Sequence, residues 1–147
     1  MPNKNDYGRK VKVYYNLHKK LFSVVALEGD MKGKVIEHTD KIDLAKPIFR
    51  VQRAGREKVL REKRKNVHAY VAGYRCELKS DKELERNGAF KWVIATYDPY
   101  KYDSFVSVKD KIKVSHCRYA SLSLEKGLRV SDDYIYHKDH NYKFGRN

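Results

Sequence analysis

The sequence predicts a β-rich α+β domain, in which a mostly antiparallel sheet carries one prominent basic helix. Short segments in which apolar and polar residues alternate recur along the chain, as is typical of half-buried strands. Turn-forming residues separate these segments, and nothing suggests alternating strand and helix units. A single domain over residues 1–147 suits this length, with an N-terminal arm at 1–8 and a C-terminal arm at 133–147.

The first fifty residues predict strands only. Val11 and Val13 alternate with polar neighbours, and a second, more continuously apolar segment follows His18-Lys19-Lys20, which favours a hairpin. Gly33 supplies turn chemistry before the third segment, and Pro47 imposes extended geometry before the last. The predicted strands are residues 11–17, 21–27, 34–39, 41–44 and 48–51.

The stretch from residue 53 to residue 65 predicts a short, very basic helix. Its apolar stripe is thin, formed by Val59 and Leu60 with Ala54, so most of its surface is expected to face solvent or a partner. Asn66 is a suitable C-terminal stop. Only Glu57 and Glu62 oppose the seven bases of this stretch, which are Arg53, Arg56, Lys58, Arg61, Lys63, Arg64 and Lys65.

Strand alternation resumes after the helix. Residues 67–78 place His68, Tyr70 and Tyr74 on one face of a long strand. Residues 79–88 are charged and predict a loop, and 121–130 fit either a broken helix or a strand pair around Gly127. Further strands are predicted at residues 90–96, 105–108 and 112–117.

The charge distribution indicates a polyanionic partner. The formal net charge is +14, from 33 basic and 19 acidic residues, and the excess is densest in the basic stretch. Such density is costly through self-repulsion unless an anion neutralises it. The predicted partner is DNA or RNA, or else an acidic host protein, and no membrane. The predicted contacts are Arg53, Arg56, Lys58, Arg61, Lys63, Arg64 and Lys65, together with His68, Tyr70 and Tyr74 as a following aromatic surface.

Motifs for catalysis or metal binding are weak, so a binding protein is favoured over an enzyme, and neither metal nor cofactor is predicted. Cys76 and Cys117 form no close-spaced pair, which suits a reducing cytoplasm. The histidines of residues 137–141 faintly resemble metal or nuclease ligands but lack a supporting framework. His68 beside so many cations suggests proton transfer in RNA cleavage, yet it has no second catalytic partner. The favoured interpretation of His68 is a histidine on a sheet face.

The strings VYYNLHKKLFSV, KVIEHTD and REKVLREKRKNVHAYVAGY, which all lie in the first half of the chain, resemble a family of small tailed-bacteriophage proteins with a KVLREKRKNVHA-type basic block. The resemblance implies a phage origin and action in the cytoplasm of an infected bacterium. It implies no reaction and no catalytic residue.

These observations favour non-specific or shape-based nucleic-acid binding through the basic helix, since no motif for reading base sequence is present. The alternative is a phage inhibitor that binds an acidic surface or a nucleic-acid channel of a host defence or nucleic-acid-processing protein. A virion or scaffold component and a metal-free nuclease are further alternatives.

Overall fold

The computed structural model describes residues 8–78, 80–86 and 90–133. Within these residues, nine strands form a single sheet in which every neighbouring pair is antiparallel. The predicted β-rich, antiparallel character is therefore confirmed. The elements are β1 (Lys10–Asn16), β2 (Leu21–Ala26), β3 (Val35–Thr39), β4 (Lys41–Val51), α1 (Arg53–Glu62), β5 (Ala69–Cys76), α2 (Asp81–Arg86), β6 (Trp92–Thr96), β7 (Val106–Ser107), β8 (Tyr119–Ser123) and β9 (Gly127–Ser131).

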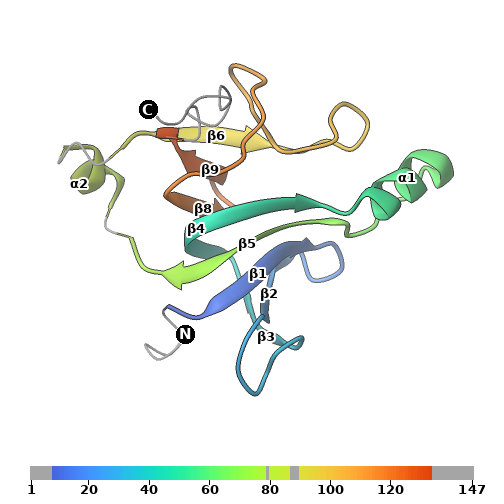
Figure 1. Cartoon of the computed structure of the whole chain (residues 1–147), viewed down its shortest axis with the longest axis horizontal. Helices are drawn as coiled ribbons and strands as arrows, with labels where there is room; N and C mark the ends of the chain where they lie inside the picture. The colour runs from blue at the N-terminus through green and yellow to red at the C-terminus, as the bar shows by residue number, and fades with distance from the viewer. Residues whose placement is uncertain (1–7, 79, 87–89, 134–147) are drawn as a thin grey trace.

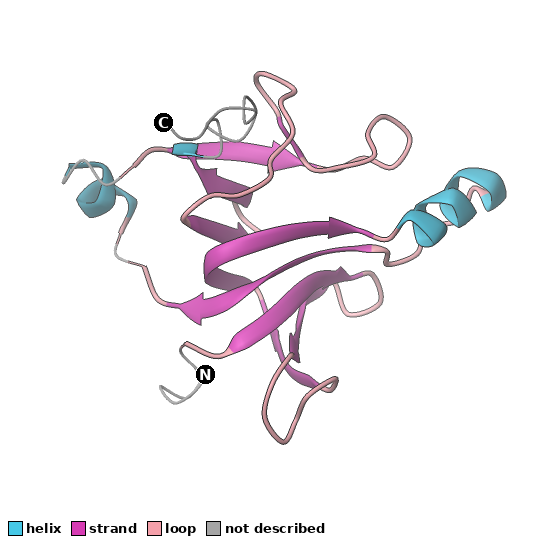
Figure 2. Ribbon diagram, viewed as in Figure 1, coloured by secondary structure: helices cyan, strands magenta, loops and turns pink. Residues whose placement is uncertain are grey.

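The strands lie in the order β3-β2-β1-β5-β4-β8-β9-β6-β7. A three-stranded meander, β1-β2-β3, occupies one side of the sheet, and β8, β9 and β6 occupy the other (Figure 1). The central pair, β5 and β4, joins the two sides. The two helices lie at opposite ends of the sheet and cover neither face (Figure 2).

An irregularity in β4 bends the middle of the sheet. The register with β5 shifts between Ala45 and Ile48, where Lys46 has a φ of 51° and Pro47 is fully buried. Proline is accommodated in a sheet at such a bulge because it has no N–H to donate. Opposite the bulge a glycine is required, since a Cβ on Gly73 would lie 2.9 Å from the carbonyl oxygen of Ala45. The two strands predicted at 41–44 and 48–51 are thus one bulged strand.

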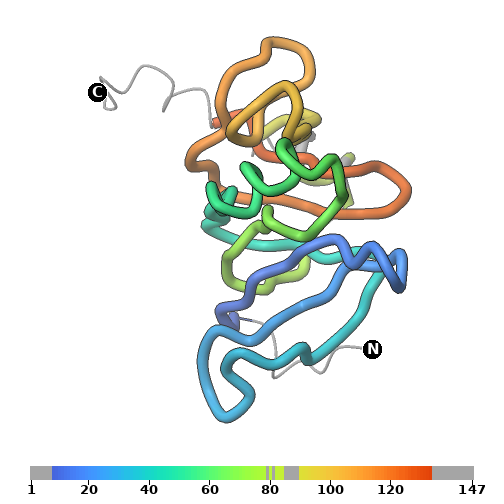
Figure 3. Tube along the Cα trace, turned by 90° about the vertical axis from the view of Figure 1, so that its right-hand side faces the viewer, coloured from blue at the N-terminus to red at the C-terminus, as the bar shows by residue number. Residues whose placement is uncertain are grey.

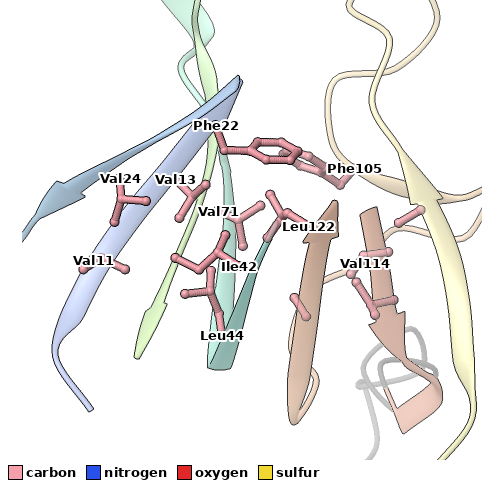
Figure 4. Close-up of a cluster of buried hydrophobic side chains, with 13 residues drawn as sticks. Val11, Val13, Phe22, Val24, Ile42, Leu44, Val71, Phe105, Val114 and Leu122 are labelled. Carbon is pink, nitrogen blue, oxygen red and sulfur yellow. The ribbon is translucent and has the colours of Figure 1, made fainter. Parts of the chain in front are cut away.

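The core lies on one face of the curved sheet. Alternate residues of β1, Val11 and Val13, are fully buried there beside Val71 of β5. Side chains from both sides of the sheet point toward this shared interior, with Ile42 and Leu44 of β4 at its centre (Figure 4). Because apolar residues alternate along the strands, one face supplies the hydrophobic stabilisation and the opposite face carries polar residues.

Several predicted elements need correction. The loop predicted at residues 79–88 contains a short helix, α2, which Ser80 caps by accepting the backbone N–H of Glu83 at 3.4 Å. Residues 112–117 form no strand and make only isolated bridges. Of the two alternatives for residues 121–130, a broken helix or a strand pair, the strand pair is correct, and Gly127 has a φ of 75° in the turn. Nearly all of the predicted N-terminal arm (residues 1–7 of 1–8) and of the C-terminal arm (134–147 of 133–147) lies outside the described residues.

Candidate nucleic-acid interface

Helix α1 is shorter than the basic stretch that contains it. It spans Arg53–Glu62 and ends where Lys63 adopts a left-handed conformation, with a φ of 59°, and donates its backbone N–H to the oxygen of Val59 at 2.8 Å. Arg64 and Lys65 therefore lie beyond the helix, in an extended segment that leads to β5. The prediction of helix as far as Lys65 is wrong by three residues.

Three residues of α1 anchor it against the rest of the chain. Val59 is 2% exposed and is the one apolar side chain of the predicted stripe that is buried. Gly55 allows the helix to approach closely, because a Cβ there would lie 2.5 Å from the Cβ of His68. The Nε of Arg56 donates to the carbonyl oxygens of Pro99 and Tyr102, at 3.1 and 3.0 Å. Arg56 thus fastens α1 to the loop between β6 and β7 through its Nε.

His68 lies buried beneath α1 and is held at both ring nitrogens. Its Nδ1 lies 3.1 Å from the backbone oxygen of Asn66, which can only accept, so Nδ1 carries the proton. Its Nε2 lies 2.6 Å from the hydroxyl of Tyr97. Burial raises the pKa of Tyr97 above its ordinary value, an effect that Arg56 opposes, so the hydroxyl stays protonated and able to donate. His68 precedes the strand and is a structural residue, with no free ring nitrogen to serve as a base.

The other bases of the stretch are exposed. Among the described residues, the ion pair that this stretch makes is between Nη2 of Arg61 and Oε2 of Glu62, at 3.8 Å. An exposed pair at that distance neutralises little. The exposed cations, hereafter the cationic rim, are Arg53, Lys58, Arg61, Lys63, Arg64 and Lys65.

A cavity of about 470 Å³ opens beside the cationic rim. Viewed from this end, α1 stands in front, between the loop that follows β6 and the hairpin of β1 and β2 (Figure 3). The lining comes from these elements and from residues 65–69, which lead into β5, and it is mostly aromatic and aliphatic. It consists of Tyr15, Leu17, Val59, Lys65, Asn66, Val67, His68, Ala69, Tyr97, Asp98, Pro99 and Tyr100.

The sequence prediction and the structure differ over the aromatic residues. Tyr70 and Tyr74 do not line this cavity: Tyr70 lies under Nζ of Lys12, at 4.8 Å, and Tyr74 borders a separate hollow beside the β4 bulge. The rings that accompany the cations are instead Tyr15, Tyr97 and Tyr100. They come from segments far apart in the sequence, so no local pattern groups them.

No helix in the described part of the chain has the length and apolar character needed to cross a bilayer. Within residues 8–78, 80–86 and 90–133, no three histidine, cysteine or acidic side chains gather into a metal-binding group. The motif at residues 137–141 lies outside those ranges. His116 bonds its neighbour Ser115 at Nδ1, at 3.1 Å, and Cys117 donates to the oxygen of Tyr119.

The chain is a strongly basic, antiparallel β-sheet protein with a cationic helix and an open cavity at one end of the sheet. The chain belongs to the family of the Mycobacterium phage L5 gene 82 protein, whose model matches residues 4–129. The gene 82 protein of Mycobacterium phage L5 is 41% identical over 103 residues, which cover 66% of this chain and 76% of that protein. No solved structure is significantly similar to this chain.

This membership confirms the predicted bacteriophage origin. The match also extends well past the first half of the chain, to which the sequence resemblance was limited. The role of the basic block as a family signature remains a prediction.

Proposed function

We propose that this phage protein acts inside the infected bacterium by binding nucleic acid without base-sequence specificity, through the cationic rim. The observation that carries the proposal is the exposure of six bases within residues 53–65. Each phosphate that such a side chain neutralises releases counterions, which is the main source of non-specific affinity. Arg56, His68 and Val59 hold the helix in place and leave the rim free for phosphate contacts.

The second candidate is an inhibitor of a host defence or nucleic-acid-processing protein, docked through the same end of the molecule. Leu17 and Val67, each more than 40% exposed at the cavity, favour it, because exposed aliphatic side chains are typical of protein interfaces. Affinity purification from expressing bacteria, with and without nuclease, separates the two candidates. A stoichiometric host protein that survives nuclease supports the inhibitor, whereas loss of all recovered material supports nucleic-acid binding.

The direct test replaces Arg61, Arg64 and Lys65 with alanine in one variant and measures binding to DNA and RNA of unrelated sequences over a range of salt. We expect affinity to fall alike for all sequences, and the slope of log K against log salt to flatten by about 3 on duplex DNA. The matched control removes three exposed lysines elsewhere, Lys32, Lys34 and Lys109. Equal losses in the two variants, or no loss in either, contradict the assignment to the rim.

A further inference from the structure

The cavity beside α1 gathers exposed apolar side chains that the fold does not need. Tyr15, Leu17, Val67 and Tyr100 all line it, and they are between 41% and 54% exposed. They come from the end of β1, the segment before β5 and the loop after β6. Because three separate parts of the chain expose apolar groups at one hollow, the hollow has the character of a ligand site.

The floor of the cavity is firmly built. Tyr97 packs against His68 and Phe105, with ring centroids 5.4 Å apart in both pairs, and Phe105 packs in turn on Phe49, at 5.5 Å. This ring series joins the cavity to the buried core. The hydrogen bond between Tyr97 and His68 fixes the floor further. A ligand would therefore meet a preformed surface and would lose little free energy in ordering it.

The charge around the cavity is positive. Lys65 lines it, and Nζ of Lys63 lies 5.8 Å from the ring centroid of Tyr100, while Arg61 and Arg64 are exposed in the same stretch. The acid in the lining is Asp98, whose carboxylate accepts the backbone N–H of Tyr100 at 2.9 Å and so shapes the turn. An aromatic hollow bordered by cations complements a ligand with a flat ring and a flanking negative charge.

We propose that this cavity takes an unpaired base of single-stranded nucleic acid, with Tyr100 as its stacking ring and the cationic rim on the flanking phosphates. The inference rests on the proposed function and narrows it to single strands. Stacked aromatic side chains beside a cationic track are the recurring way in which proteins hold single strands without reading sequence. A duplex keeps its bases stacked and paired, so it can reach the rim but cannot place a base in the cavity.

The test compares binding of the full chain to an oligonucleotide of about 12 thymidines and to a duplex of the same length. A second oligonucleotide carries one 2-aminopurine, whose fluorescence reports stacking on an aromatic ring. The variant is Tyr100→Ala, and its matched control is Tyr74→Ala, an exposed tyrosine that does not line the cavity. Circular dichroism and the thermal midpoint establish that both variants are folded.

We expect Tyr100→Ala to weaken single-strand binding about tenfold, to abolish the 2-aminopurine signal and to leave duplex binding within about twofold. Tyr74→Ala should change none of the three. The variant that lacks Arg61, Arg64 and Lys65 should lose affinity for both ligands.

If Tyr100→Ala spares single-strand binding, or weakens both ligands equally, the cavity inference is overturned while the rim proposal stands. Failure of the parent protein to bind either ligand overturns both. A third outcome assigns the cavity to a protein contact instead. In that case the parent protein binds no oligonucleotide but retains a host protein after nuclease treatment, and Tyr100→Ala loses that host protein.

Discussion

Positive charge is exposed at one end of β5 and buried at the other. Before its first residue, the side chains of the cationic rim are exposed. Near its last residue, Arg75 is 4% exposed and its Nη1 donates to Oε1 of Glu37 in β3. Strands β2 and β1 separate these two partners, a span of about 14 Å in a flat sheet, so curvature brings them together on the concave face.

The contrast shows which charges serve stability and which do not. A buried guanidinium without a carboxylate costs several kcal/mol, so Arg75 is matched by an acid. The rim is exposed, and the ion pair between Arg61 and Glu62 at 3.8 Å neutralises little of its charge, so the rim contributes little to folding. Changes at the Arg75 end should therefore alter stability with little effect on binding, and changes at the rim should do the reverse.

The largest expected effect is at the Arg75 end. Glu37→Gln should lower the free energy of unfolding by about 3 kcal/mol, because it leaves a buried charge without its partner. Urea denaturation measures the loss. The matched control, Glu57→Gln on the exposed side of α1, should change stability by less than about 0.5 kcal/mol. Equal effects for the two variants would remove the contrast between the ends.

At the other end, Gly55→Ala should destabilise the protein by about 1–3 kcal/mol, since the new methyl group would collide with His68. Helix propensity alone predicts the opposite sign, a gain of about 1 kcal/mol. Lys58→Ala, at an exposed position of the same helix, is the control and should be close to neutral. A stabilised Gly55→Ala variant would show that α1 does not pack on His68.

The hydrogen bond between Tyr97 and His68 should contribute a smaller amount. Tyr97→Phe leaves Nε2 of His68 buried without its donor, and we expect a loss of about 1 kcal/mol. Tyr100→Phe, which removes an exposed hydroxyl, should have no effect on the thermal midpoint. Similar shifts for both would argue against a structural role for His68.

The two cysteines should have no effect near neutral pH and a measurable one in alkali. Burial raises the pKa of Cys76 to about 12, with Asp43 adding to the effect, and burial followed by Asp133 raises that of Cys117 to about 12. The unfolded chain releases these protons first, from its ordinary value of 9.0, so stability should fall as pH rises from there toward about 12.

Alkylation provides the direct measurement: at pH 8 iodoacetamide should label both thiols slowly in the folded protein and rapidly in urea. Cys76→Ser should remove part of the alkaline loss of stability. Rapid labelling of the folded protein would show that these thiols are accessible.

Much of the sheet was predictable, because strand alternation is a local property. The alternation of Val11 and Val13 predicts β1, and the polar turn after it predicts the hairpin. Helix α2 was missed although Ser80 and Glu83 have the spacing of a capping box, since the density of charge there suggested a loop. The end of α1 could not be predicted, because lysine is not a residue that favours the left-handed conformation which Lys63 adopts.

The candidate site was predictable only in its charge. The bases are consecutive in sequence, so their density is visible without a structure. The cavity is assembled from β1, the segment before β5 and the loop after β6, and long-range packing alone brings Tyr15 and Tyr100 to one place. Arg56 could not be told from its neighbours either, because its acceptors are backbone oxygens more than forty residues away.

The way in which β4 pairs has a consequence for how the chain matures on the ribosome. Its first half pairs with β8 from Lys41 to Ala45, and the partner residues 119–123 are synthesised long after β1 to β5 can assemble. During that interval the half-made sheet presents an open edge, the kind of surface on which nascent chains pair wrongly. We expect truncated chains that stop before residue 119 to aggregate. We also expect the full-length chain to be most prone to aggregation during synthesis before residues 119–123 pair with β4.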